Sequence, residues 1–308
     1  MTKKIPHTNI NDLKQQVADL SGVCCDESES ALPILNVTTA CSQASICLQG
    51  AHLLSWRPKG EDDVIWMSSQ ARPLPGKSLR GGIPVCWPWF GAHESEAAYP
   101  AHGFARTVMW QLHDVRGLSK NETQVILTLD MHDMDQNIQA MWPYDCVLEY
   151  IITVGKTLKL KLVTHNKSSQ AFNITQALHS YFNVQDVKKT HVVGLDGLEY
   201  LDKPDAFKRK KQKAEVSITA EVDRIYLQTP SQLSIHTPSR KIHLSSQGSQ
   251  STVVWNPWKD VAEKMGDLGD DGYLKMLCVE TANAADDVIS IAAGEQQELI
   301  VEYSLDKK

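Results

Sequence analysis

The stretch Leu158–Val163 has the sequence LKLKLV and alternates apolar with charged side chains. Successive side chains of a β-strand point to opposite faces, so the leucines share one face and the lysines share the other. One apolar and one charged face are typical of a half-buried strand in an antiparallel sheet. This stretch therefore predicts antiparallel β-structure in the middle of the chain.

Short segments of strand-like composition fill most of the chain on both sides of this stretch. They are rich in β-branched and aromatic residues and are separated by Gly, Pro, Asn, Asp and Ser. The expected strands are Ile34–Thr39, Ser45–Gln49, His52–Arg57, Val64–Met67, Val108–Val115, Gln124–Leu129, Cys146–Val154, Thr157–His165, Ala171–Leu178, His191–Val193, Glu215–Ile218, Arg224–Gln228, Gln232–His236, Lys241–Ser245, Thr252–Asn256 and Gln296–Tyr303. So many short strands predict an all-β fold, a large antiparallel β-sandwich with a few short helices.

Three segments depart from this pattern. The apolar residues of Asn9–Leu20 recur at helical spacing and predict a short amphipathic helix. Arg72–Ala105 is rich in Pro, Gly and Trp, and we expect a long ordered loop, which in a compact domain is usually functional. Asp260–Asp271 is expected to hold a short helix and a turn. We expect residues 1–30 to form a helical or irregular N-terminal extension and residues 31–308 to form one β-sandwich domain.

Composition and charge exclude several classes of protein. The formal net charge of -6 argues against nucleic acid as a partner. The basic run Lys208–Lys213 is expected to be a solvated loop, because short runs of like charge repel. The 7 cysteines contain no Cys-x-x-Cys pair and fit the reduced thiols of a cytosolic protein. No stretch reaches the roughly 20 apolar residues of a membrane span, so we expect a cytoplasmic protein with no membrane partner. No apolar run follows Met1–Pro6, so we expect no signal peptide, and nothing requires a dimer, so we expect a monomer.

Three candidate binding residues lie in Gly-containing turns within or just after the predicted loop. Arg80 precedes Gly81 and Gly82, where backbone and guanidinium can both approach a ligand, and guanidinium can bind phosphate through two parallel hydrogen bonds. His102 and Arg106 flank a Gly-Phe turn, and Arg106 offers a second anion contact. Each also fits an ordinary role, as a surface Arg in a turn or a hydrogen-bonded structural His.

Three further residues suit acid–base or sugar chemistry. His179 ends an apolar strand, and imidazole titrates near neutral pH, which suits proton transfer. Glu280 follows three apolar residues in an expected interior strand, where a carboxylate is costly unless it is paired or used. Asp223 precedes a strand and can accept hydrogen bonds from sugar hydroxyls. The ordinary interpretations are a core His for His179, a buried salt bridge or a sheet-edge residue for Glu280, and a turn-capping Asp for Asp223.

The sequence has none of the familiar motifs of cofactor or nucleophile chemistry. It contains no P-loop, no Rossmann fingerprint, no G-x-S-x-G and no H-E-x-x-H. His102 and His179 have no partners at the spacing of a familiar metal site. The remaining interpretation is acid–base chemistry without a cofactor or a metal.

Five motifs together, in this order, resemble the glucose-6-phosphate 1-epimerases, the hexose-6-phosphate branch of the aldose 1-epimerase (galactose mutarotase-like) superfamily. They are Arg80–Pro84 (RGGIP), Ala101–Arg106 (AHGFAR), His179–Phe182 (HSYF), Val254–Trp258 (VWNPW) and Cys278–Glu280 (CVE). The resemblance runs from about Pro33 to the end of the chain. The five motifs in combination are far more specific than any one of them.

The resemblance implies a fold, a reaction and a set of residues. The fold is a large antiparallel β-sandwich of the galactose mutarotase type, and the reaction interconverts the α and β anomers of glucose 6-phosphate without a cofactor. His179 takes the place of the family's catalytic acid and Glu280 that of its base. The substrate-contacting residues correspond to Arg80, Arg106 and Asp223, the last on a short match. His102 is expected to contact a sugar hydroxyl. Ala101 stands where some members bind substrate with Gln, so that contact is absent or supplied differently.

Three alternatives remain open at this stage. An epimerase of free aldohexoses would use the same chemistry, although the two Arg-containing motifs favour a phosphorylated sugar. A non-catalytic β-sandwich that senses sugar phosphates would not need both His179 and Glu280. A glycoside hydrolase usually needs a pair of carboxylates, and the sequence offers no compelling partner for Glu280.

Overall fold

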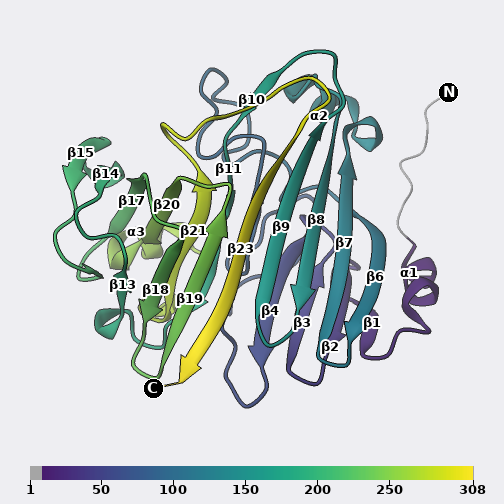
Figure 1. The fold of residues 1–308 in the computed structure, drawn as a ribbon, viewed down its shortest axis with the longest axis horizontal. Helices are drawn as coiled ribbons and strands as arrows, with labels where there is room; N and C mark the ends of the chain where they lie inside the picture. Colours follow the sequence, from purple (N-terminus) through teal and green to yellow (C-terminus); the bar gives the residue numbers. More distant parts are fainter. Residues whose placement is uncertain (1–8, 308) are drawn as a thin grey trace.

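The computed structural model describes residues 9–307, and antiparallel strands dominate it (Figure 1). In the largest sheet the long strands lie side by side across the front of the view in Figure 1. In spatial order the nine strands of this sheet are β16 (Val216–Ser217), β13 (His191–Val193), β18 (Gln232–His236), β19 (Arg240–Gln247), β23 (Gln296–Lys307), β9 (Leu158–Asn166), β8 (Cys146–Val154), β7 (Glu122–Asp130) and β6 (Gln111–Ser119).

The second sheet has eight strands and carries the candidate site. In spatial order its main path is β15 (Lys208–Lys211), β14 (Glu199–Asp202), β17 (Val222–Leu227), β20 (Ser251–Asn256), β21 (Met276–Asn283), β11 (Gln176–Leu178) and β5 (Val85–Cys86). The eighth strand, β12 (Tyr181–Asn183), also pairs with β21. Two strands that are close in sequence, β11 and β12, therefore both lie against β21.

Two small sheets and a few short helices complete the described part of the chain. The four-stranded sheet consists of β1 (Val23–Glu27), β2 (Pro33–Thr38), β3 (Ser42–Cys47) and β4 (His52–Pro58), and the two-stranded sheet of β10 (Phe172–Ile174) and β22 (Ile289–Ile291). The helices are α1 (Ile10–Val17), α2 (Gln136–Met141), α3 (Trp258–Met265) and α4 (Gly272–Lys275), with 3-10 turns η1 (Met131–Asp133), η2 (Val187–Lys189) and η3 (Lys203–Asp205). Within residues 9–307, no helix has the length and apolar character that crossing a membrane requires.

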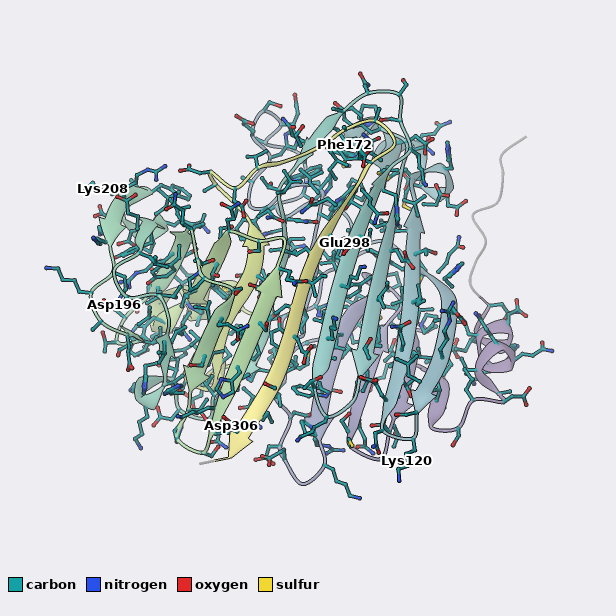
Figure 2. All side chains as sticks on the ribbon, in the orientation of Figure 1. Lys120, Phe172, Asp196, Lys208, Glu298 and Asp306 are labelled. Atoms are coloured by element: carbon teal, nitrogen blue, oxygen red, sulfur yellow. The ribbon has the colours of Figure 1, made fainter. Side chains whose placement is uncertain are left out.

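The apolar faces of the sheets meet in a shared core, which confirms the predicted β-sandwich. Strand β9 shows the alternation expected from LKLKLV, because Leu158, Leu160 and Leu162 are all buried. On the opposite face Lys161 Nζ lies 2.6 Å from a carboxylate oxygen of Glu298 on the neighbouring strand β23, where Figure 2 labels Glu298. The same core cluster contains Leu35, Leu53 and Ile235 together with Leu160 and Val279.

Most of the predicted strands are confirmed, but two have a different form. The expected strand Ala171–Leu178 divides at Thr175 into β10 and β11, which belong to different sheets. The Thr175 hydroxyl accepts a hydrogen bond from the Phe90 backbone N–H at 2.8 Å. The backbone N–H of Thr175 donates a hydrogen bond to the Pro88 carbonyl. Val64–Met67 makes only isolated bridges, from Ile65 to Phe182 of β12 and from Met67 to Gly81 in the loop.

The basic run was wrongly predicted to be a loop. Lys208–Lys211 forms β15, the edge strand of the eight-stranded sheet, and pairs with β14. Its positive charges are tolerated because acidic neighbours offset them: Lys210 Nζ lies 2.6 Å from Asp202, and Lys208 Nζ lies 2.8 Å from Asp205. Figure 2 shows Lys208 at the far left of the molecule.

The N-terminal extension is more regular than expected. The predicted helix is present as α1, and it packs through Leu13 and Val17. Residues 23–27, expected to be irregular, form β1, which pairs with β2 along its full length and buries Cys25. Strand β1 of the N-terminal extension therefore belongs to the same four-stranded sheet as β2, β3 and β4. The domain boundary at residue 30 stays a prediction. Arg72–Ala105 is a long irregular segment as predicted, with β5 as its strand.

Candidate active site

Glu280 lies on β21 of the eight-stranded sheet, and His179 lies in the short break between β11 and β12. Because β11 and β12 both pair with β21, the short break between them holds His179 against β21 beside Glu280. Leu178 lies opposite Thr281, which fixes the register on one side of the break. His179 Nε2 lies 3.4 Å from Glu280 Oε1.

The same register aligns a row of side chains across four strands. Asp223 on β17 lies opposite Trp255 on β20, Trp255 lies opposite Cys278 on β21, and Cys278 lies opposite Tyr181 on β12. Directly opposed residues share a face of a sheet, and residues two apart on one strand share it too. Glu280, two residues beyond Cys278, therefore belongs to the same face as this row.

The His179–Glu280 pair is nearly closed off from solvent. The side chains are 10% and 2% exposed, and every residue of β21 is buried. Among the described residues, His179 Nδ1 and Glu280 Oε2 are buried without a hydrogen-bond partner. Leaving a buried polar atom unpaired costs roughly 1–3 kcal/mol. These two atoms therefore point to a ligand that would supply the missing hydrogen bonds.

Burial also sets the electrostatics of the pair. It raises the pKa of Glu280 well above its usual range, and the nearby Asp223 carboxylate raises that pKa further. Burial lowers the pKa of His179, and the positive charges of Arg106 and Arg80 act in the same direction. Both shifts disfavour the charged form of each group. The pair therefore favours a neutral carboxylic acid and a neutral imidazole over a strong ion pair.

Tyr181 connects the pair with Arg80. Its ring lies nearly parallel to the His179 ring, with the centroids 4.8 Å apart and 9° between the planes. Its hydroxyl accepts a hydrogen bond from Arg80 Nη1 at 3.1 Å, and Arg80 Nε donates to Asp267 at 3.0 Å. Within the described chain these contacts use two of the five guanidinium N–H donors. Arg80 is therefore held near the pair with donors left for a ligand.

His102 and Arg106 lie on the other side of His179. The His102 and His179 ring centroids are 5.7 Å apart, and Phe90 packs edge-on against His102. Burial lowers the pKa of His102 to about 3, so this imidazole is neutral at physiological pH. Arg106 Nη2 donates to the Ala101 carbonyl at 2.7 Å, while its buried Nε has no partner among residues 9–307.

Gly103 fixes the turn that positions these two residues. It has a positive φ of 69°, and a Cβ atom there would lie 1.9 Å from the Trp87 carbonyl oxygen. Only glycine allows the two backbone segments to come this close. The turn is therefore held directly against the segment that carries Trp87.

Asp223 is already paired in this structure. Its carboxylate lies 2.7 Å from Lys203 Nζ, and the Lys203 side chain is 54% exposed. The Lys203 charge lowers the pKa of both Glu280 and His102. The site therefore includes a third cation beside the two arginines.

A comparison with known families identifies the group of proteins to which the chain is related. The profile of the aldose 1-epimerase family matches residues 34–304. This chain belongs to the aldose 1-epimerase family. The match covers the break that holds His179, the strand that carries Glu280 and all the turns described above.

Relatives within the epimerase family share most of the chain. A protein of Escherichia coli named "Putative glucose-6-phosphate 1-epimerase" is 39% identical over 247 residues, covering 79% of this chain and 81% of that protein. A protein of the same name from Cenchrus ciliaris is 32% identical over 262 residues, covering 82% and 78%. The crystal structure of a "putative mutarotase" from Salmonella typhimurium has a TM-score of 0.85 and 33% identity, covering 93% of this chain and 94% of that one.

The candidate site brings the predicted residues together to different degrees. His179, Glu280 and His102 are immediate neighbours. Arg80 reaches His179 through Tyr181, while Arg106 and Asp223 act on the pair through their charges.

Three residues of the candidate site were missed from the sequence. Lys203 and Tyr181 carry no motif of their own, although Tyr181 lies within the HSYF sequence. Trp255, in the VWNPW sequence, is edge-on to His179 with the ring centroids 6.1 Å apart. A prediction of strand register could have found Trp255, but the sequence contains no signal for Lys203.

Side chains of the candidate site also offer a set of metal-ligand atoms. His179, Cys278 and Glu280 each present one such atom, and all three lie within 4.8 Å of one another. Nitrogen, sulfur and carboxylate oxygen suit a zinc ion. The positive charges of Arg80 and Arg106 act on this cluster, however, and oppose the entry of a cation.

The aromatic residues of the RGGIP-containing loop divide between core and site. Trp87 is fully buried and packs against Phe104 and Trp142, so it belongs to the core. Trp89 donates its indole N–H to the Pro100 carbonyl at 2.9 Å. Phe90 packs on His102, which places it beside the site.

Proposed function

We propose that this aldose 1-epimerase family member interconverts the α and β anomers of glucose 6-phosphate and related hexose 6-phosphates. The observation that carries the proposal is the buried His179–Glu280 pair, whose unpaired nitrogen and oxygen atoms lie near two arginines. The names of the curated relatives support the choice of substrate.

The reaction needs one base and one acid. Glu280 as carboxylate takes the proton of the C1 hydroxyl, while protonated His179 gives a proton to the ring oxygen O5. The C1–O5 bond breaks, and C1 becomes an aldehyde. After rotation about C1–C2, the same two transfers run in reverse and close the ring on the other face. A positioned acid or base contributes about 10²–10⁴-fold to the rate.

The pair returns every proton it takes, so no net charge is gained or lost during turnover. Before ring opening the pair is ionised, and after ring opening both groups are neutral. Burial raises the pKa of Glu280 and lowers that of His179, which favours the neutral state and so favours ring opening. Hydrogen bonds from the sugar to the two unpaired atoms would stabilise the ionised state before the reaction.

The phosphate group would be recognised by guanidinium groups. Arg80 retains free N–H donors, and Arg106 has a buried Nε without a partner among the described residues. Charge-assisted hydrogen bonds from Arg to phosphate are among the strong ones. Local cations outweigh the overall charge of -6 at such a site. Holding the phosphate would also keep C6 in place while C1 moves.

Exchange spectroscopy by NMR tests the proposal. The rate of exchange between the α and β anomers should rise with protein concentration for glucose 6-phosphate, and less for glucose. Equal enhancement for both sugars would contradict phosphate recognition. Binding of the sugar phosphate without any enhancement would instead indicate a non-catalytic sensor.

One observation favours an epimerase of free aldohexoses as the second candidate. Arg80 is paired with Asp267 at 3.0 Å, and this carboxylate partly offsets the charge that a phosphate would meet. Under this alternative Arg80 would be structural. Faster exchange for glucose or galactose than for glucose 6-phosphate would select it.

A further inference from the structure

Tyr181 contacts both parts of the proposed site. Its ring stacks on His179, the proposed acid, and its hydroxyl accepts a hydrogen bond from Arg80, a proposed phosphate contact. One buried side chain therefore joins the group that would bind the phosphate to the group that would move the proton.

The packing around Tyr181 leaves little room for independent movement. Tyr181 is 2% exposed, and the Trp66 ring also lies nearly parallel to it, at 6.1 Å and 21°. Trp255 meets both Tyr181 and His179 edge-on, each at 84° between the planes. Close-packed interiors transmit displacements, so a small movement of the Tyr181 ring would be passed on to His179.

The Tyr181 hydroxyl can respond to an anion at Arg80. Burial raises the pKa of this hydroxyl far above its ordinary value, so it keeps its proton at any physiological pH. It accepts a hydrogen bond from Arg80 and can donate its own proton to a phosphate oxygen. An anion held by both groups would therefore fix the orientation of the Tyr181 ring.

The charges act in the same direction as the packing. The positive charge of Arg80 contributes to the low pKa of His179. A phosphate dianion bound at Arg80 would offset that charge and favour the protonated imidazole, which the proposed ring opening requires. An anion at Arg80 would thus both orient and activate the acid.

We propose that Tyr181 is a positioning residue through which a phosphate group bound at Arg80 orients His179 for proton transfer, an inference that rests on the proposed function. The phosphate then does more than anchor the sugar, because its binding also prepares the reacting centre. Binding energy from a non-reacting part of a substrate can be used in this way.

Splitting the substrate into two pieces tests the coupling. Glucose supplies the reacting ring, and sodium phosphite supplies the dianion without a covalent link. Exchange of the glucose anomers is measured by NMR with the wild-type protein at increasing phosphite concentrations. The rate without protein at each concentration is subtracted, because phosphite is itself a base. We expect saturable activation of roughly 5–150-fold, the usual range for coupling between sites.

Two matched variants locate the coupling. Tyr181→Phe keeps the ring and removes the hydroxyl, so phosphite activation should be lost and kcat should fall more for glucose 6-phosphate than for glucose. Tyr226→Phe makes the same change at another buried tyrosine of this sheet, whose hydroxyl donates to Gln212 at 2.7 Å. This control should keep the full activation. Thermal unfolding of both variants checks that each is folded.

A measurement on the wild-type protein keeps the test independent of the variants. The ring ¹⁵N resonances of His179 should shift when phosphite saturates the protein. Unchanged resonances, or full phosphite activation of Tyr181→Phe, would overturn the coupling. Absence of activation in a wild-type protein that prefers glucose 6-phosphate would overturn it too, while leaving the proposed function intact. Equal turnover of glucose and glucose 6-phosphate would instead remove the phosphate specificity on which the inference rests.

Discussion

Lys203 Nζ lies 2.7 Å from Asp223 Oδ2, and these opposite charges both act on Glu280. The Asp223 carboxylate raises the pKa of Glu280, and the Lys203 ammonium lowers it. Because the two residues are paired, removing either charge exposes Glu280 to the other. Substitutions at the two positions should therefore shift the pH dependence in opposite directions.

Asp223→Asn should move the limb of the kcat/KM profile that Glu280 controls to lower pH. Glu280 acts as a base only when ionised, and loss of the Asp223 charge lets it ionise at lower pH. A shift on the order of half a pH unit is expected for a nearby, partly screened charge. The shift is measured from the pH profile of anomer exchange with glucose 6-phosphate. Loss of a sugar contact would lower the rate at every pH, whereas the charge effect moves the limb along the pH axis.

Lys203→Met should move the same limb to higher pH. Without the ammonium group, Asp223 is unpaired and opposes ionisation of Glu280 more strongly. Lys59 is solvent-exposed and distant from Lys203 in the sequence. Lys59→Met is therefore a control that should leave the limb in place. Shifts of equal sign in the Asp223 and Lys203 variants would show that these charges do not control Glu280.

Glu280→Gln should reduce anomer exchange to the spontaneous rate. The amide has nearly the same shape as the carboxyl group but cannot take a proton, and a loss of about 10²–10⁴-fold is typical of a general base. Stability should be unchanged or higher, because the variant removes a buried ionisable group. Exchange NMR and thermal unfolding measure the two effects, and near-wild-type exchange would remove Glu280 from the base role.

Arg80→Ala should weaken binding of glucose 6-phosphate more than binding of glucose. The expected difference corresponds to about 1.5–3 kcal/mol for a lost hydrogen bond to a charged group. Arg72 lies in the same loop but is exposed and bonds to backbone carbonyls, so Arg72→Ala is a matched control. Titration calorimetry with both sugars measures the difference, and equal losses would argue against a phosphate contact.

His52 should make the protein less stable in acid. Its buried Nε2 donates to the Gly81 carbonyl at 2.8 Å, and burial lowers its pKa to about 4. The unfolded chain takes up this proton near pH 6.5, so the unfolded state binds more protons between about pH 6.5 and 4. The free energy of unfolding therefore falls as the pH is lowered through this window, by up to about 1.4 kcal/mol per pH unit.

Urea unfolding at several pH values tests the His52 prediction. His52→Gln removes the titrating group, so its free energy of unfolding should depend less steeply on pH than that of the wild type. The exposed His113 offers the control, and His113→Gln should keep the wild-type slope. Equal slopes in wild type and His52→Gln would show that this imidazole does not contribute.

The sequence predicted those strands that a local pattern of apolar and polar side chains determines. The alternation in Leu158–Val163 specified a strand because one face must be buried, and Cys146–Val154 has the predicted bounds for the same reason. The division of Ala171–Leu178 could not be predicted, since it depends on hydrogen bonds from Thr175 to a loop that is distant in sequence. The charges of Lys208–Lys211 likewise concealed a strand, because acidic residues elsewhere offset them.

The sequence motifs predicted the candidate site residues. They did not reveal which of these residues meet in space, because that depends on how the strands pair. His179 and Glu280 are 101 positions apart, and only the pairing of β11 and β12 with β21 brings them within 3.4 Å. Lys203 was missed because its contact with Asp223 crosses from a 3-10 turn to a neighbouring strand. No spacing in the sequence indicates such a contact.

The lysine-rich strand β15 also has a consequence for self-association. An edge strand exposes unpaired backbone groups that can recruit a strand from another molecule. A second copy adding antiparallel at β15 would place its own Lys208–Lys211 beside the first, and the like charges would repel. The charged side chains of this short edge strand therefore discourage extension of the eight-stranded sheet from one molecule into the next.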